Sequence, residues 1–170
     1  MDFHLVSEWH LAAPIEAVWA VLDSPAAWPQ WWPEIQRIET LHAGGNNDLG
    51  AIRRTWWTSR LPYGFVIDFT TRAVEKPTLL VVEATGDLAG MGRWELASIP
   101  AGTRVRYTWQ VFPHKWWMRA LAPLLAPLFA WNHHAVMRDG AIGMARQLGV
   151  ELIDYRNRLS KPGPQSNLAQ

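Results

Sequence analysis

Residues 28–38 read WPQWWPEIQRI, and the sequence predicts a change from helix to strand inside this stretch. Trp28, Trp31 and Trp32 are spaced i, i+3 and i+4, so their indoles share one face of a helix. Pro33 should end that helix near Trp32, because the residue before a proline disfavours the α region. The indoles can plug one end of a core, line the mouth of a cavity or rest on a membrane, and the stretch itself leaves all three open.

The sequence before this stretch predicts one strand followed by two short helices. Residues 3–12 alternate with period two, which is typical of a strand with one buried face. The first helix should run from Pro14 to Leu22, since its apolar residues recur at i, i+3, i+4 and i+7. The second should begin at Pro25, with Ser24 as its N-cap, and carry the tryptophans.

After the tryptophan cluster the pattern becomes that of a β-meander. Short alternating or β-branched segments are separated by clusters of turn-forming residues. We expect strands over 35–42, 50–61, 65–73, 79–85, 91–99 and 105–111. Such a sheet has an apolar face that another element must cover, and the C-terminal helix is the available cover.

The C-terminal part is predicted to be helical from after Pro113 to about Leu159. Pro123 and Pro127 should divide this region, because a proline inside a helix removes a hydrogen bond and clashes with the preceding turn. Residues 160–170 contain turn formers and little apolar surface, so they are expected to be a disordered tail.

The composition excludes several classes of protein. A chain of 170 residues suits one domain, which is expected over residues 1–159. The absence of cysteine excludes disulfides and thiolate metal sites, and a net charge of +1 does not favour nucleic-acid binding. The histidines form no HExxH or similar motif, so neither a metal nor a cofactor is expected.

The longest apolar stretch, residues 116–131, does not predict a membrane span. It has sixteen residues with Arg119 and two prolines inside it, whereas a span needs about 18–20 apolar residues. Residues 1–36 contain no Lys or Arg, the basic partners that strengthen interfacial binding of an aromatic cluster. The first residues also lack a secretory signal. We therefore expect a cytoplasmic protein without stable membrane insertion.

Several motifs occur in an order that resembles a known superfamily. They are LAAPIEAVWAVL (11–22), WPQWWPEI (28–35), GDLAGMGRWEL (86–96), GTRVRYTW (102–109) and WNHHAVM (131–137). Over about residues 3–155 this order resembles the helix-grip, or SRPBCC, superfamily, which includes START lipid-transfer domains, Bet v 1-like allergens and polyketide cyclase/dehydrase-like proteins. The polyketide cyclase-like branch is the most similar.

The resemblance implies an α+β fold in which a seven-stranded curved antiparallel sheet wraps around a long C-terminal helix. Two short helices follow the first strand, and an elongated apolar cavity lies between the sheet and the last helix. The superfamily binds lipids, sterols, polyketides and other hydrophobic molecules, and only some of its members catalyse a reaction.

Strand parity selects the side chains that should face this cavity. Adjacent residues on a strand point to opposite faces, and Trp57 is expected inside because Thr55 shares its parity. Trp56 shares the parity of Arg54 and is expected outside. The candidate ligand-binding residues are Trp31, Trp32, Arg53, Trp57, Phe65, Ile67, Phe69, Trp94, Leu96, Tyr107, Trp109, Asn132, His133 and Val136. For each of them, a purely structural role is the alternative.

Two further features bear on the interior. Arg53 has the inward parity, and a buried charge must be paired or solvated, so its position predicts a water-filled cavity or an anionic ligand group. Gly90, Gly92, Gly140 and Gly143 lie on the expected inner surface. Their missing side chains either leave room for a ligand or allow a close approach of two elements.

Three functions are compatible with these patterns. The first is non-catalytic binding of a hydrophobic small molecule, which fails if the space between sheet and helix is filled. The second is a polyketide cyclase, dehydratase or aromatase, in which at least two of Arg53, Tyr107, Asn132 and His133 must converge on one point. The third is an interaction module, such as a homodimer that uses an outward tryptophan of the sheet.

Overall fold

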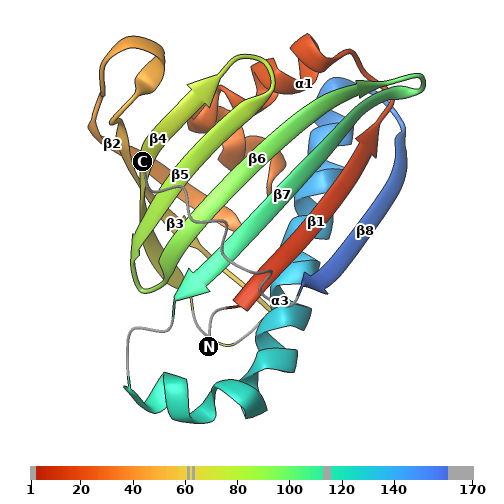
Figure 1. Cartoon of the computed structure of the whole chain (residues 1–170). Helices are drawn as coiled ribbons and strands as arrows, with labels where there is room; N and C mark the ends of the chain where they lie inside the picture. Colours follow the sequence, from red (N-terminus) through yellow and green to blue (C-terminus); the bar gives the residue numbers. More distant parts are fainter. Residues whose placement is uncertain (1–2, 61, 63, 113–115, 161–170) are drawn as a thin grey trace, which may run out of the picture.

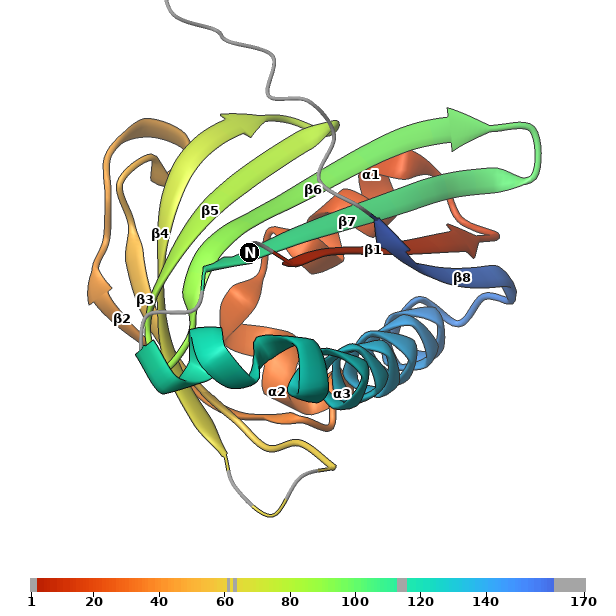
Figure 2. The same ribbon diagram turned by 60° about the horizontal axis from the view of Figure 1, so that its bottom comes forward.

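The computed structural model describes residues 3–60, 62, 64–112 and 116–160. These residues form a curved antiparallel sheet and a long helix that crosses its concave face (Figures 1 and 2). The strands are β1 (Phe3–Leu11), β2 (Ile35–His42), β3 (Ile52–Trp57), β4 (Phe65–Glu75), β5 (Leu79–Gly86), β6 (Ala89–Ile99), β7 (Gly102–Phe112) and β8 (Leu152–Ser160). Their order in the sheet is β2-β3-β4-β5-β6-β7-β1-β8.

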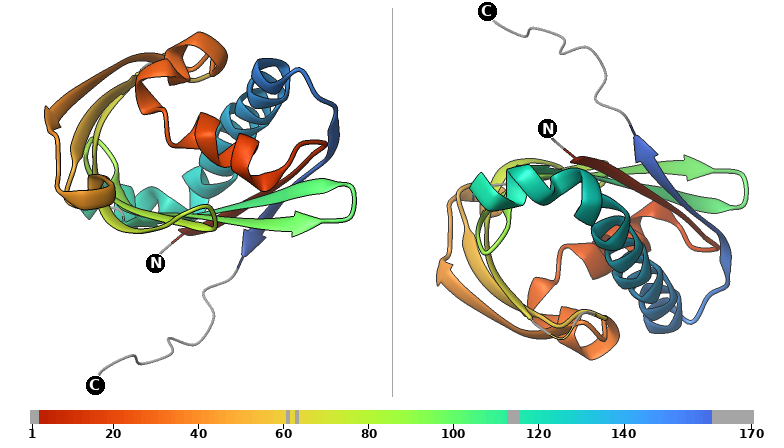
Figure 3. Two further views of the ribbon diagram at one scale, coloured as in Figure 1. Left: turned by 90° about the horizontal axis from the view of Figure 1, so that it is seen from above. Right: turned by 90° about the horizontal axis from the view of Figure 1, so that it is seen from below.

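The described residues also form five helical segments. They are α1 (Ile15–Leu22), the 3-10 helix η1 (Pro25–Ala27), α2 (Trp28–Trp31), the 3-10 helix η2 (Asn46–Asp48) and α3 (Trp116–Leu148). Figure 3 shows α1 and α2 on the same side of the sheet as α3. The predicted helix-grip architecture of the α+β class is therefore confirmed.

The second short helix differs in detail from the prediction. A single helix was expected from Pro25, but the chain forms η1 and then a four-residue α2. Ser24 does not cap it, because its hydroxyl donates instead to the carbonyl oxygen of Ala20 at 2.8 Å. The predicted end is correct, since Trp32 already has an extended backbone.

The C-terminal prediction was wrong beyond Leu148, where a helix was expected to continue to about Leu159. Gly149 adopts φ +65°, and its N–H bonds to the carbonyl of Arg146 while that of Val150 bonds to the carbonyl of Ala145. These two bonds form a Schellman motif, which ends a helix. The chain then turns back to form β8, which pairs with β1, so the sheet has eight strands where seven were expected.

Pro123 and Pro127 do not divide the long helix. Helix α3 is continuous from Trp116 to Leu148, but its axis changes direction in its first half (Figures 1 and 3). A bend without a break is a common result of a missing hydrogen bond at proline. The predicted disordered tail falls outside the described residues, except for Ser160, which ends β8.

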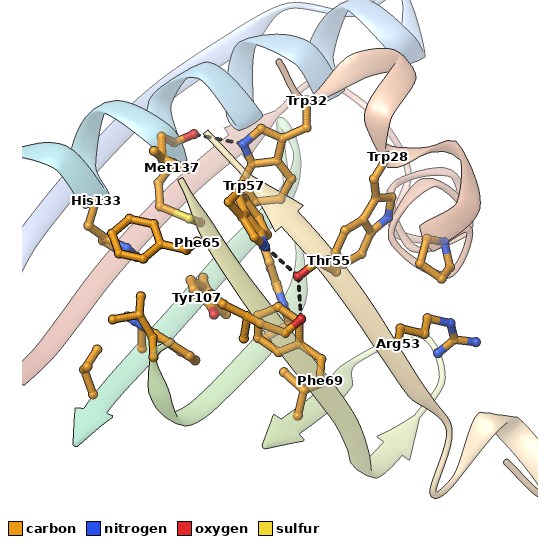
Figure 4. A pocket seen from close by; sticks show the side chains of 18 of the residues that line it. Trp28, Trp32, Arg53, Thr55, Trp57, Phe65, Phe69, Tyr107, His133 and Met137 are labelled. Carbon is orange, nitrogen blue, oxygen red and sulfur yellow. Dashed lines mark hydrogen bonds between the residues drawn. The ribbon is translucent and has the colours of Figure 1, made fainter. Parts of the chain in front are cut away.

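Two glycines allow α2 to pack directly against α3. A methyl group added at Gly140 would collide with the indole of Trp32, and one added at Gly143 would collide with the carbonyl of Trp31. Trp32 also donates its Nε1–H to the carbonyl oxygen of Val136 on α3, at 3.0 Å (Figure 4). These glycines therefore serve the close approach of two helices and do not leave room for a ligand.

Candidate ligand cavity

A cavity lies between the concave face of the sheet and α3. The centre of a water molecule can move through about 220 Å³ of this cavity. Because atoms extend beyond their centres, a molecule that fills the cavity has a larger volume than this. Strands β1 to β7 and α3 all contribute to its wall (Figure 4). Its apolar lining includes Leu5, Leu22, Ile38, Phe65, Ile67, Phe69, Val74, Leu80, Val82, Leu88, Phe129, Val136 and Met137.

Trp32 is the centre of an aromatic cluster at one side of the cavity. Its ring centroid is 5.3 Å from that of Trp57 and 5.4 Å from that of Trp31, and three more indoles lie at 6.0–6.2 Å. Edge-to-face and offset pairs at these separations stabilise an aromatic core. Trp32 and Trp28 line the cavity, so the opening cluster of the sequence is at once a plug and a cavity wall.

The adjacent tryptophans of β3 point to opposite faces, as predicted. Trp57 lines the cavity and donates its Nε1–H to Thr55 Oγ1 at 2.7 Å, and that hydroxyl donates in turn to the carbonyl of Ile67 at 2.9 Å. Trp56 lies on the outer face, where the guanidinium of Arg37 covers its ring at 4.7 Å. Whether this outer face forms a dimer stays a prediction that sedimentation can test.

A second aromatic group with polar atoms lies on the β6–β7 side of the cavity. The ring of Tyr107 is 4.2 Å from that of Trp94 and 6.3 Å from those of Trp109 and His133. Burial raises the pKa of the Tyr107 hydroxyl, and burial followed by the charge of His134 lowers the pKa of His133 to about 3. Both groups are therefore neutral near pH 7, and among the described residues His133 Nε2 has no hydrogen-bond partner.

Three charged side chains of the cavity wall belong to ion pairs within the chain, namely Arg53, Asp48 and Asp23. Arg53 lines the cavity, as its parity predicted, and its Nη2 lies 2.7 Å from Asp48 Oδ2. Asp23 is paired with Lys76 Nζ at 2.6 Å. Because Asp48 already compensates Arg53, its inward position does not require the anionic ligand group that the sequence suggested.

The structure brings most of the predicted candidates together. Trp31 and Leu96 do not line the cavity, because they are buried in the core behind it with 6% and 4% of their surface exposed. Asn132 lines the cavity, but its Oδ1 accepts a hydrogen bond from the backbone N–H of Arg60 at 3.0 Å. The others that line it are Trp32, Arg53, Trp57, Phe65, Ile67, Phe69, Trp94, Tyr107, Trp109, His133 and Val136.

Some lining residues were missed from the sequence. Thr55 could have been found from the parity that it shares with Trp57, and Phe129 from its position seven residues before Val136 on one helical stripe. Leu5 comes from β1, and no local pattern indicates that this strand borders the cavity. Gly92 leaves no free space there, because an added methyl group would lie 2.8 Å from the Tyr107 hydroxyl.

The described residues form neither a cluster suited to a metal ion nor a helix suited to cross a membrane. Within the described part of the chain, no group of three or more His, Asp or Glu side chains could hold a metal ion. No described helix combines the length and apolar character needed to cross a bilayer.

A curved antiparallel sheet that grips a long helix, with a cavity between them, defines the helix-grip class. Residues 2–149 match the family described as polyketide cyclase/dehydrase and lipid transport, and this chain belongs to that family. No match was found among curated proteins.

Solved structures share the fold at low sequence identity. The Zhui aromatase/cyclase from Streptomyces sp. R1128 has a TM-score of 0.73 and 13% identity, covering 88% of this chain and 94% of its own. A START superfamily protein from Mycobacterium smegmatis has a TM-score of 0.67 and 16% identity, covering 86% of this chain and 97% of its own. At such identities the likeness shows the fold alone.

Proposed function

We propose that this protein binds and carries an uncharged, largely apolar small molecule in the cavity between the sheet and α3. The observation that carries the proposal is the cavity itself, about 220 Å³ lined mainly by aromatic and aliphatic side chains. Ligand sites are concave, mostly apolar and furnished with a few polar groups that orient their contents. A lipid, a polyketide or another aromatic or isoprenoid-like molecule has this character.

The polar groups of the wall support an uncharged ligand. His133 and Tyr107 are neutral near pH 7, so they can exchange hydrogen bonds with a hydroxyl or carbonyl but cannot compensate an ion. Arg53 is held by Asp48 at 2.7 Å. An anionic ligand would therefore lose its hydration without gaining an unpaired cation among the described lining residues.

A cyclase, dehydratase or aromatase is the second candidate. It is supported by the fold shared with an aromatase/cyclase and by the neighbouring rings of Tyr107 and His133. Against it, a histidine with a pKa of about 3 is a poor general base at neutral pH. Asn132 is engaged by Arg60, and Arg53 lies apart from His133 in Figure 4.

The first test is to look for the natural ligand. Native mass spectrometry of the freshly purified protein should show a co-purifying apolar molecule of one or a few masses. Binding is then measured with N-phenyl-1-naphthylamine, an uncharged fluorescent probe, by energy transfer from the indoles that surround the cavity.

A matched pair of variants on β5 tests the location of the site. Val82 lines the cavity, whereas Val81 is the residue before it on the strand and points to the other face. Val82→Phe should fill part of the cavity and weaken probe binding at least about tenfold, whereas Val81→Phe should leave binding unchanged. Equal affinities in the two folded variants, as checked by thermal unfolding, would place the probe outside the cavity.

A further inference from the structure

Hydrogen bonds hold one segment of the cavity wall to two neighbouring parts of the chain. Thr58 and Ser59, which follow β3, line the cavity. The backbone N–H of Thr58 donates to the carbonyl of Glu34 at 2.8 Å, and the N–H of Arg60 donates to Asn132 Oδ1 at 3.0 Å. These bonds tie residues 58–60 to the turn before β2 and to α3.

The same segment takes part in a cluster of three ionisable side chains. Arg60 Nη2 lies 3.0 Å from Asp139 Oδ2 on α3, and the neighbouring carboxyl group of Asp139 is one of the groups that raise the pKa of Glu34. Two neighbouring carboxyl groups repel each other when both are ionised. Glu34 is 8% exposed, and among the described residues its Oε2 has no hydrogen-bond partner. With both acids ionised, the cluster would hold two negative charges against one positive charge.

This imbalance distinguishes the cluster, whose three residues lie outside the lining itself, from the ion pairs of the cavity wall. Arg53 with Asp48 and Lys76 with Asp23 are pairs of one base and one acid. In the cluster, protonation of a carboxyl group removes an excess charge. Its electrostatic energy therefore changes where that carboxyl group titrates.

We propose that Glu34, Arg60 and Asp139 form a proton-dependent latch that holds residues 58–60 closed over the cavity. The inference rests on the proposed function, because what the latch controls is the uptake and release of the bound molecule. When Glu34 carries a proton, Asp139 alone faces Arg60, so the latch is firm and exchange of the ligand is slow. When Glu34 and Asp139 are both ionised, their repulsion loosens the segment and exchange is fast.

The direction of the pH effect follows from the environment of Glu34. Burial, then the hydrogen bond with Asp139 and the charge of Asp139, raise the pKa of Glu34 to about 7, while its own backbone and Arg60 act in the opposite sense. In an open state the carboxyl group meets water and has its ordinary value near 4.5. The closed state is thus favoured most below pH 4.5, loses its advantage as pH rises towards 7, and changes no further above that.

The size of the effect has an upper bound. Each pH unit that separates the pKa values of the open and closed states is a tenfold change in the opening equilibrium. A value of about 7 against 4.5 limits the change to roughly 300-fold. Part of that change lies below pH 5, and water reaches part of the cluster, so we expect release to accelerate by roughly 10- to 50-fold between pH 5 and pH 8.

The experiment measures the release rate of N-phenyl-1-naphthylamine by stopped-flow fluorescence from pH 5 to pH 8 at constant ionic strength. The wild type should release the probe faster as pH rises. Glu34→Gln and Asp139→Asn each leave one acid to face Arg60. Glu34→Gln should lose the pH dependence and stay slow, whereas Asp139→Asn should weaken the dependence without abolishing it, because burial still raises the pKa of Glu34. Arg60→Met should be fast throughout, and Lys76→Met, a control at the other charged pair, should behave as the wild type.

The outcomes separate the latch from the proposed function. If the wild type binds the probe but its release rate is flat, or if Glu34→Gln retains the wild-type dependence, the latch is wrong while ligand binding stands. If no probe binds at any pH, the proposed function fails. The latch then has its own readout, because amide hydrogen exchange at Thr58 and Arg60, corrected for the intrinsic effect of pH, should still accelerate between pH 5 and pH 8.

Discussion

At the scale of single residues, Trp32 shows how one side chain connects three elements. It packs on indoles from the strands, donates a hydrogen bond to α3 and occupies the space left by the missing side chain of Gly140. Only 1% of its surface is exposed. The sequence identified Trp32 as a candidate, but it could not show that a glycine more than a hundred residues away fits against it.

This contact predicts an unusual cost for Gly140→Ala. In an exposed helix the change should stabilise by about 1 kcal/mol, but here the methyl group collides with the indole and overpacking should destabilise by about 1–3 kcal/mol. Trp32→Phe makes room, so Gly140→Ala should cost less in that background. Urea unfolding of the four proteins measures the coupling, and a stabilising Gly140→Ala in the wild type would contradict the packing.

At the scale of elements, the end of α3 shows the limit of a periodicity argument. The apolar stripe of the helix continues plausibly past Leu148, yet Gly149 ends it and β8 begins at Leu152. In the sequence, Gly149 is followed by a partial alternation of apolar and polar residues from Leu152 onwards. Over so short a segment, the same residues also fit one apolar face of a helix. The pairing with β1 decides between them, because it satisfies the backbone hydrogen bonds of β8.

The helix end can be tested at Gly149 itself. An added methyl group meets nothing within 4 Å, so Gly149→Ala should destabilise only through its positive φ, by about 1 kcal/mol. Gly149→Asn should cost less, because asparagine tolerates the left-handed region. Equal stabilities of the three proteins in chemical denaturation would rule out backbone strain at this position.

At the scale of the whole molecule, the buried neutral histidine links the cavity to folding. His133 has an ordinary pKa near 6.5 and a value of about 3 in the folded protein, so the unfolded chain binds its proton more tightly. Its contribution to stability is therefore complete above pH 6.5 and is lost as pH falls towards 3. Glu34 acts in the opposite sense, since its raised pKa favours the folded protein at low pH.

His133→Gln removes one of these two opposing effects. Between pH 6 and pH 4 the unfolding free energy of the variant should fall less steeply than that of the wild type. The two slopes should differ by about 1 kcal/mol per pH unit. Glutamine retains polar character in the cavity wall without gaining a charge. Parallel pH profiles of the unfolding free energy for the two proteins would show that His133 is not held neutral by its burial.

The sequence by itself determined the order of the first seven strands, the two helical regions between β1 and β2, the inward parity of Trp57 and most of the aromatic wall, because these depend on neighbours close in the chain. It also placed Arg53 inside, but not Asp48 as its partner. The tertiary structure decided whether the interior is filled or hollow, how Trp31 and Trp32 divide between core and cavity, and which groups surround Glu34. These features arise from residues that are far apart in the chain and meet only when α3 crosses the sheet, so no local period or spacing can encode them.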